Sequence, residues 1–159
     1  MTLEALFAGR NYDIPQAQRR CREAAAEAGL PWSERTMSFN SRLAQELGKW
    51  AESRGRGDAF QDAVFRAYFA AGRNIAKTEV LLDLARAAGL PEEEAGEVLR
   101  TRPFRKAVDT DWSLAAELNI TAVPTFRLGL QTVVGAQPYP VLEKLLTTGG
   151  VPRRPSMTH

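Results

Sequence analysis

Cysteine and histidine are almost absent from this chain, and their scarcity excludes several kinds of chemistry. The 159 residues contain one cysteine, Cys21, so the chain has no internal disulfide and no Cys-x-x-Cys motif. The single histidine, His159, ends a tail rich in proline and arginine, where we expect it to be solvated. A Ser-His-Asp triad and a histidine-based metal site are therefore excluded.

Long hydrophobic runs and clustered charge are also missing. No run of about 18 apolar residues occurs and the first residues do not begin a signal peptide, so no membrane partner is expected. The 17 arginines and 4 lysines are scattered among acids rather than clustered, which argues against nucleic acid. One cysteine suits a reducing compartment, so we expect a cytoplasmic location.

Helical periodicity fills the first 118 residues. Asp13 is expected to cap the first long helix, and Gly89 to end a later one in the left-handed conformation. The expected helices are Asp13 to Ala28, Asn40 or Ser41 to about Arg54, Asp58 to about Ala71, Thr78 to Ala88, Pro91 to about Arg100, and a segment from Arg102-Pro103 to Leu118.

Apolar stripes on these helices indicate a core. Cys21 shares a face with small alanines, so we interpret it as a small buried hydrophobic residue rather than a redox thiol. The last of these helices is expected to bury Trp112. The expected aromatic core, for which a hydrophobic substrate groove is the alternative, comprises Trp50, Phe60, Phe65, Tyr68 and Phe69.

The period then changes from 3.6 to 2, which predicts a β-hairpin. Its strands are Thr125 to Leu128 and Gln131 to Val134, joined around Gly129, and a final helix follows from Tyr139 to Leu146. Immediately before the hairpin lies Val123-Pro124-Thr125, and we expect the Val123–Pro124 bond to be cis.

Several segments together resemble the DsbA/FrnE-like branch of the thioredoxin superfamily, whose relatives include 2-hydroxychromene-2-carboxylate isomerase and kappa-class glutathione transferase. The resemblance covers about Leu3 to Leu146. The segments that carry it are Asn40-Ser41-Arg42-Leu43-Ala44, Phe65-Arg66-Ala67-Tyr68-Phe69, Glu79-Val80-Leu81-Leu82, Ala122-Val123-Pro124-Thr125-Phe126 and Gly135-Ala136-Gln137-Pro138-Tyr139.

The resemblance implies a mostly helical α/β thioredoxin-like fold that lacks its first part. In such proteins a strand, a Cys-x-x-Cys at a helix N-terminus and another strand come first, and about a third of the usual chain is absent here. We expect one truncated domain over 1–148, with a helical insertion in 1–118 and a strand-strand-helix unit in 119–148. A disordered tail is expected over 149–159.

The resemblance also implies a binding site around the proline loop. The site would comprise Val123, Pro124 and Thr125, with the proline turning the backbone of Val123 outward so that it pairs with a substrate peptide or with the cysteinyl part of glutathione. The alternative is a proline that only shapes a turn. Ala136 and Gln137 match positions that hold the γ-glutamyl carboxylate of glutathione, with an ordinary helix cap as the alternative. No catalytic residue, metal or required cofactor is expected, and glutathione is a candidate ligand.

Two functions of different classes follow. The first is a thiol–disulfide oxidoreductase or glutathione-dependent isomerase, as the family implies, with a thiol supplied from elsewhere and a peptide or protein thiol as substrate. The second is a non-catalytic remnant that binds peptides or dimerises. Because a lone hairpin leaves a strand edge and the apolar side chains of Val123, Phe126 and Leu128 open, we also expect a homo-oligomer.

Overall fold

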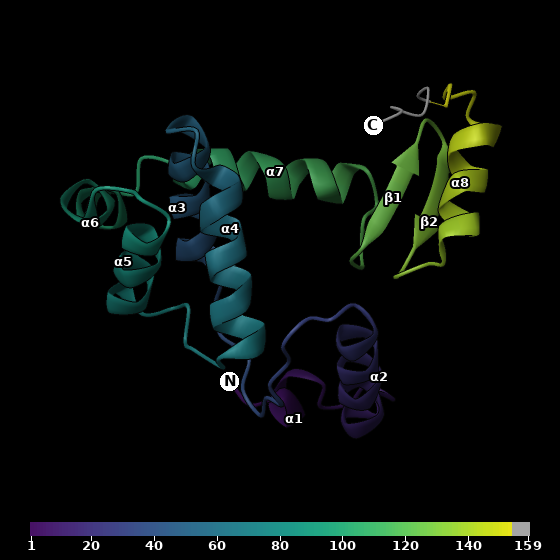
Figure 1. Ribbon diagram of the computed structural model, residues 1–159, viewed down its shortest axis with the longest axis horizontal. Helices are drawn as coiled ribbons and strands as arrows, with labels where there is room; N and C mark the ends of the chain where they lie inside the picture. The colour runs from purple at the N-terminus through teal and green to yellow at the C-terminus, as the bar shows by residue number, and fades with distance from the viewer. Residues whose placement is uncertain (154–159) are drawn as a thin grey trace. The chain divides into compact units, whose positions relative to one another are not determined.

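The computed structural model describes residues 1–153, which form two compact units, 1–109 and 110–153 (Figure 1). The boundary between the units falls inside helix α7, Arg105–Glu117. The elements are mainly helical with one two-stranded sheet, as the sequence predicts. The end of the expected tail, 154–159, and with it His159, lies outside the described residues.

Unit 1 is helical and begins its main elements where the sequence places caps. The Asp13 carboxylate accepts the Gln16 N–H at 2.8 Å at the start of α2, and Asn40 Oδ1 accepts the Arg42 N–H at 2.8 Å at the start of α3. The elements are α1 (Leu3–Leu6), α2 (Ile14–Glu27), α3 (Arg42–Ser53), α4 (Gly57–Phe65), a π-helix η1 (Arg66–Ala70), α5 (Thr78–Ala87), α6 (Glu92–Thr101) and the start of α7.

The hydrophobic core of unit 1 lies between α3, α4, α5 and α6, which pack on one another. Leu47, Phe60 and Leu81 are fully buried there, and Trp50 is nearly so. Burying each such side chain stabilises the fold by about 1.5–3 kcal/mol. This part of the aromatic core prediction is confirmed.

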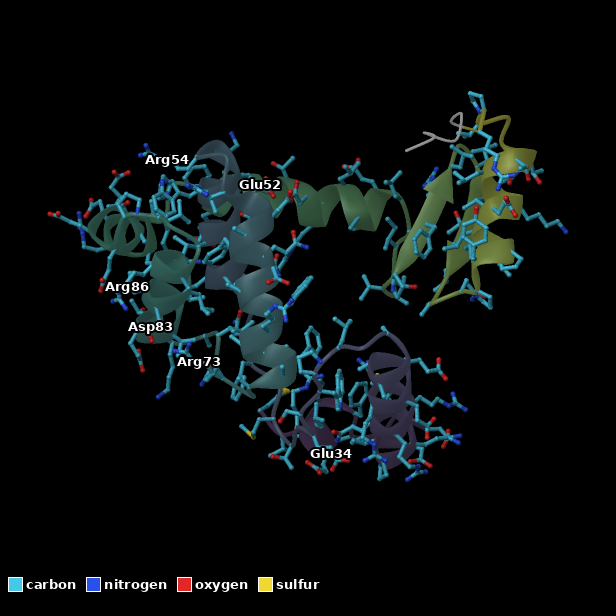
Figure 2. The ribbon with its side chains drawn as sticks, in the orientation of Figure 1. Glu34, Glu52, Arg54, Arg73, Asp83 and Arg86 are labelled. Carbon is cyan, nitrogen blue, oxygen red and sulfur yellow. The ribbon has the colours of Figure 1, made fainter. Side chains whose placement is uncertain are left out.

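Ion pairs lie on the outer side of α5, away from the core. Figure 2 shows Arg73, Asp83 and Arg86 pointing toward one another there, with separations of 2.7 Å and 3.2 Å from Asp83 to the two arginines. Exposed pairs of this kind contribute little each to the free energy of unfolding. Packing rather than surface charge therefore holds these helices together.

Helix α2 corrects the interpretation of Cys21 as a buried residue. Cys21 is exposed, and α2 buries no residue at all. The helix is held instead by polar contacts: Gln18 exchanges two hydrogen bonds with the backbone of Arg35, and Arg22 pairs with Glu34. The periodic pattern predicted the helix correctly, but a stripe of alanines and one cysteine does not pack against the core.

Two aromatic residues that were predicted to be buried are half exposed. Phe65 and Trp112 each have 51% of their surface accessible. Phe65 lies where α4 passes into η1, so the expected single helix from Asp58 to Ala71 is an α-helix followed by a π-helix. The π-helix begins directly after Phe65, a change that an unbroken 3.6 period does not anticipate.

Unit 2 contains the hairpin and the last helix. Strands β1 (Thr125–Leu128) and β2 (Gln131–Val134) pair antiparallel, with Thr125 opposite Val134 and Leu128 opposite Gln131. Gly129 in the turn has a φ of 58°, a conformation that glycine adopts without strain. Helix α8 (Tyr139–Thr148) lies along β2 (Figure 1). Both strands match their predicted bounds.

The last helix closes over one end of the hairpin because Gly149 has no side chain. A Cβ atom at Gly149 would lie 2.0 Å from Leu128 Cδ2 and 3.2 Å from the Leu145 carbonyl oxygen. Leu128 is consequently half-buried, so the expectation that it is left open is wrong, whereas Val123 and Phe126 are exposed.

Neither a membrane span nor a metal cluster occurs among residues 1–153. No helix in this range is both long enough and apolar enough to cross a bilayer. The same residues contain no gathering of three or more His, Cys, Asp or Glu side chains suited to a metal ion.

Candidate functional site

The loop before β1 is held in shape by two hydrogen bonds. The Val123–Pro124 peptide bond is cis, the conformation expected from the sequence. Pro124 O accepts the Gly135 N–H at 2.8 Å, which ties the loop to the end of β2. The Thr125 hydroxyl donates to the Ala122 carbonyl at 2.6 Å and so fixes the backbone on the other side of the proline.

Val123 is a highly accessible residue of this loop. Its side chain is 88% exposed, and within residues 1–153 its backbone N–H and C=O have no hydrogen-bond partner. An exposed, unpaired peptide group next to a fixed loop can pair with an added extended chain.

The outer edge of β1 continues this unpaired backbone. In an antiparallel pair, residues that exchange ladder bonds alternate with residues whose peptide groups point away from the partner strand. Pro124 accepts from Gly135 and Phe126 is the next paired position, so the N–H and C=O groups of Thr125 and Arg127 point outward. Neither residue has a backbone partner within the described range, and α8 lies along β2 instead (Figure 1).

Ala136 and Gln137 lie outside α8, in the loop that precedes it. Their backbone N–H groups have no acceptor among residues 1–153, so they are available to hold a carboxylate. The helix itself adds little to such a site, because Pro138 and Pro140 have no N–H to donate and leave only Tyr139 in the first turn with a free one.

The Gln137 side chain has a structural role. Its Nε2 donates to Val134 O at 2.8 Å, on the outer edge of β2. The Oε1 atom of the same amide has no donor within the described residues. Gln137 therefore closes part of the β2 edge and keeps one acceptor for a ligand.

The structure brings the two predicted segments to the same end of the hairpin. The Gly135 to Pro124 hydrogen bond joins the proline loop directly to the residues before Ala136 and Gln137. Gly135 was not among the predicted site residues, although its φ of 89° fits the glycine requirement of this tight connection.

A buried ion cluster in unit 1 was also missed by the sequence reasoning. Glu46 on α3 is 2% exposed and accepts hydrogen bonds from Arg42 at 2.8 Å and from Arg102 at 2.8 Å and 3.0 Å. The Arg102 hydrogen bond holds the pKa of Glu46 below its ordinary value, Arg42 acts in the same direction, and burial opposes them. Glu46 lies on the apolar face of α3 with Leu47. A charged residue on an apolar helix face is the sequence pattern that could have indicated this buried ion cluster.

Comparisons with known proteins agree on a family. The family model described as "DSBA-like thioredoxin domain" matches residues 13–147. A crystal structure of a probable DsbA oxidoreductase from Streptomyces coelicolor is 33% identical with a TM-score of 0.80, and the match covers 99% of this chain and 70% of that one.

Two further matches are more limited. The uncharacterized protein YwbO of Bacillus subtilis (strain 168) is 32% identical over 109 residues, which is 66% of this chain and 53% of YwbO. The present chain thus spans about half the length of this curated relative. The structure of a proposed protein disulfide isomerase from Nitrosomonas europaea, 18% identical over 84% of this chain and 72% of its own, has a TM-score of 0.66 and shows the fold alone.

Proposed function

This chain belongs to the DSBA-like thioredoxin domain family, and on that basis we propose that it binds an extended peptide or protein thiol substrate along β1, beside the proline loop. One observation carries the proposal. The peptide groups of Val123, Thr125 and Arg127 form a row without partners among residues 1–153, next to a loop fixed by two hydrogen bonds. Adding a strand there would satisfy these groups.

Catalysis of disulfide exchange needs more than these 159 residues provide. Resolution of a mixed disulfide requires a second thiol, whereas the chain has Cys21 alone. Our second candidate function is therefore an oxidoreductase in which another polypeptide or segment supplies the thiols. The likeness to the probable DsbA oxidoreductase from Streptomyces coelicolor favours it.

Glutathione is the candidate small ligand of the same site. Its cysteinyl peptide group would pair with Val123, and its γ-glutamyl carboxylate would accept from the amides of Ala136 and Gln137. This binding needs no thiol from the protein.

A backbone-blocking comparison tests the peptide proposal. We expect a ten-residue valine- and threonine-rich peptide to shift the amide NMR signals of Val123, Thr125 and Arg127. The same peptide with alternate backbone nitrogens methylated should lose binding at least about tenfold, because each net hydrogen bond is worth about 1 kcal/mol. Equal binding of the two peptides would refute strand addition.

A turnover assay tests whether Cys21 alone supports redox chemistry. The 159-residue chain should reduce insulin no faster than its Cys21→Ser variant, because neither contains a dithiol. Turnover by the chain that disappears in Cys21→Ser would contradict the need for an added thiol and establish redox chemistry at that residue.

We also propose a cytoplasmic location and self-association. The single cysteine suits a reducing compartment. When no peptide is bound, a second copy of the chain would cover the β1 edge, which would make the two partners compete for one surface.

A further inference from the structure

Unit 1 contains a cleft that the proposed peptide site does not use. It has a volume of about 320 Å³, at the lower end of the range for small-molecule pockets. Its walls come from the end of α2, the segment after it, α4 and η1. Its large apolar lining residues are Leu30, Trp32, Phe65 and Phe69, and Asp62 and Arg66 also line it.

The aromatic walls are arranged to hold a flat apolar group. Trp32 and Phe69 stack with their ring centres 5.8 Å apart, and Phe65 meets Phe69 edge to face at 6.0 Å. Phe65 keeps half of its surface accessible. The π-helix η1 supplies Arg66 and Phe69, and π-helical turns are rare and recur at functional sites.

A positive charge without a carboxylate lies behind this wall. The Arg35 guanidinium carbon is 4.8 Å from the centre of Phe69 and 5.7 Å from that of Trp32, both of which line the cleft. Within residues 1–153 no acidic side chain pairs with Arg35, whereas Arg66 is neutralised by Asp62 at 2.7 Å. The guanidinium lies nearest to Tyr68, 4.3 Å from its ring centre, and carries a positive charge that no carboxylate among residues 1–153 pairs with.

Two buried donors add to the field of this charge. Trp32 Nε1 and Arg35 Nε are inaccessible and have no acceptor among the described residues. An N–H group without an acceptor leaves positive potential around it, which favours a negative oxygen nearby. One cation without a carboxylate partner among residues 1–153 suits a ligand with a single negative charge.

From this combination we infer that the cleft of unit 1 binds a small monocarboxylate with an aromatic body, with the ring against the outer faces of Phe65, Phe69 and Trp32 and the carboxylate on the side of Arg35. The site is in a different unit from the peptide edge and goes beyond the proposed function.

Three probes that differ only in their polar end test the inference. We would titrate the chain with 3-phenylpropionate, 3-phenylpropan-1-ol and 3-phenylpropylamine and follow the indole N–H signals by NMR. The carboxylate should bind with a dissociation constant of about 1 mM, the strength of a fragment-sized ligand, and at least about fivefold more tightly than the alcohol. Trp32 should shift, whereas Trp50 in the core should not.

Single substitutions test whether Arg35 selects for the carboxylate and whether Phe65 contacts the ring of the probe. Arg35→Met keeps an unbranched side chain on the rings and should weaken the carboxylate about tenfold while leaving the alcohol unchanged. Arg20→Met removes the same charge from the exposed surface of α2 and should have no effect. Phe65→Ala, at a half-exposed position, should weaken both probes.

The inference is overturned by any of three results. Equal binding of the carboxylate and the amine would show an apolar cleft without charge selection. Carboxylate binding that survives Arg35→Met in a chain with unchanged circular dichroism would remove Arg35 from the site. No shift of Trp32 at about 10 mM probe would leave no site of fragment-binding strength.

Discussion

Glu46 is a buried charged residue whose ion pairs stabilise unit 1. It is almost fully buried, and three hydrogen bonds from Arg42 and Arg102 compensate its carboxylate. Arg102 has a φ of 53°, an uncommon conformation for a residue with a side chain, so its bonds to Glu46 also hold the end of α6. Arg42 further pairs with Asp109, which ties α3 to α7.

Replacing this carboxylate should destabilise unit 1 strongly. We expect Glu46→Gln to lower the free energy of unfolding by about 3 kcal/mol at pH 7, the lower end for a broken buried pair, because the arginines can turn toward water. Urea unfolding followed by circular dichroism measures the change. Glu52→Gln, an exposed position on the same helix, is the matched control and should leave stability nearly unchanged. Equal effects of the two variants would contradict a special role for Glu46.

The contribution of Glu46 should disappear in acid. Its pKa is lowered in the folded chain, so its stabilisation is fully present above the ordinary value of 4.5 and is lost as the pH falls through the folded value. The difference in unfolding free energy between the native chain and Glu46→Gln should therefore shrink as the pH drops below 4.5. Denaturant curves at a series of pH values test this, and a difference that stays constant would contradict it.

At the scale of elements, Gly149 determines how α8 meets the hairpin. An added methyl group would meet Leu128 and the Leu145 carbonyl, while the φ of −79° would itself accept alanine. We expect Gly149→Ala to destabilise unit 2 by about 1–3 kcal/mol through overpacking. Amide hydrogen exchange of β1 and β2 reports this change specifically.

Two variants show whether the effect is steric. Gly48→Ala lies in helix α3, where the nearest atom to the added carbon is 4.0 Å away, so stability should stay the same or rise. In the double variant with Leu128→Ala the added methyl group gains room, so the cost of Gly149→Ala should fall. Strictly additive losses would show that the contact with Leu128 is not the cause.

Elements with local signals could be predicted from the sequence, whereas burial could not. Gly89 and Pro91 marked the end of α5 and the start of α6, and the period-2 run gave both strands. The burial of Cys21 and Phe65 was mispredicted because it depends on which surfaces pack against a helix, and a periodic pattern does not contain that information. The two segments of the candidate site were predicted separately. The hydrogen bond from Gly135 to Pro124 that joins them depends on the register of the hairpin, which the sequence pattern does not define.

For the whole molecule, we predict association through the β1 edge. Light scattering should show a dimer at micromolar concentration, and Val123→Asp should shift it to a monomer by placing a charge at the interface. Val123 is 88% exposed, so this change should not unfold the chain. Leu130→Asp, at a residue 94% exposed at the turn, is the control and should stay dimeric. A monomeric native chain would contradict the prediction.

The open edge also links the two proposed partners. If a peptide and a second copy of the chain pair with the same backbone groups of β1, a saturating concentration of the peptide should convert the dimer to a monomer. Light scattering measures this change. A peptide that binds the intact dimer without dissociating it would show that the two surfaces are separate.

The Gln137 side chain gives the hairpin one usable side only. It occupies Val134 O, so a strand arriving at β2 would find little more than Thr132 to pair with, whereas β1 offers a continuous row. A subunit with one unpaired strand edge can add to the edge of a sheet, but it offers no second edge to which another strand could add. Pairing through β1 thus joins two chains and then stops, which protects a protein with an exposed strand from fibril growth.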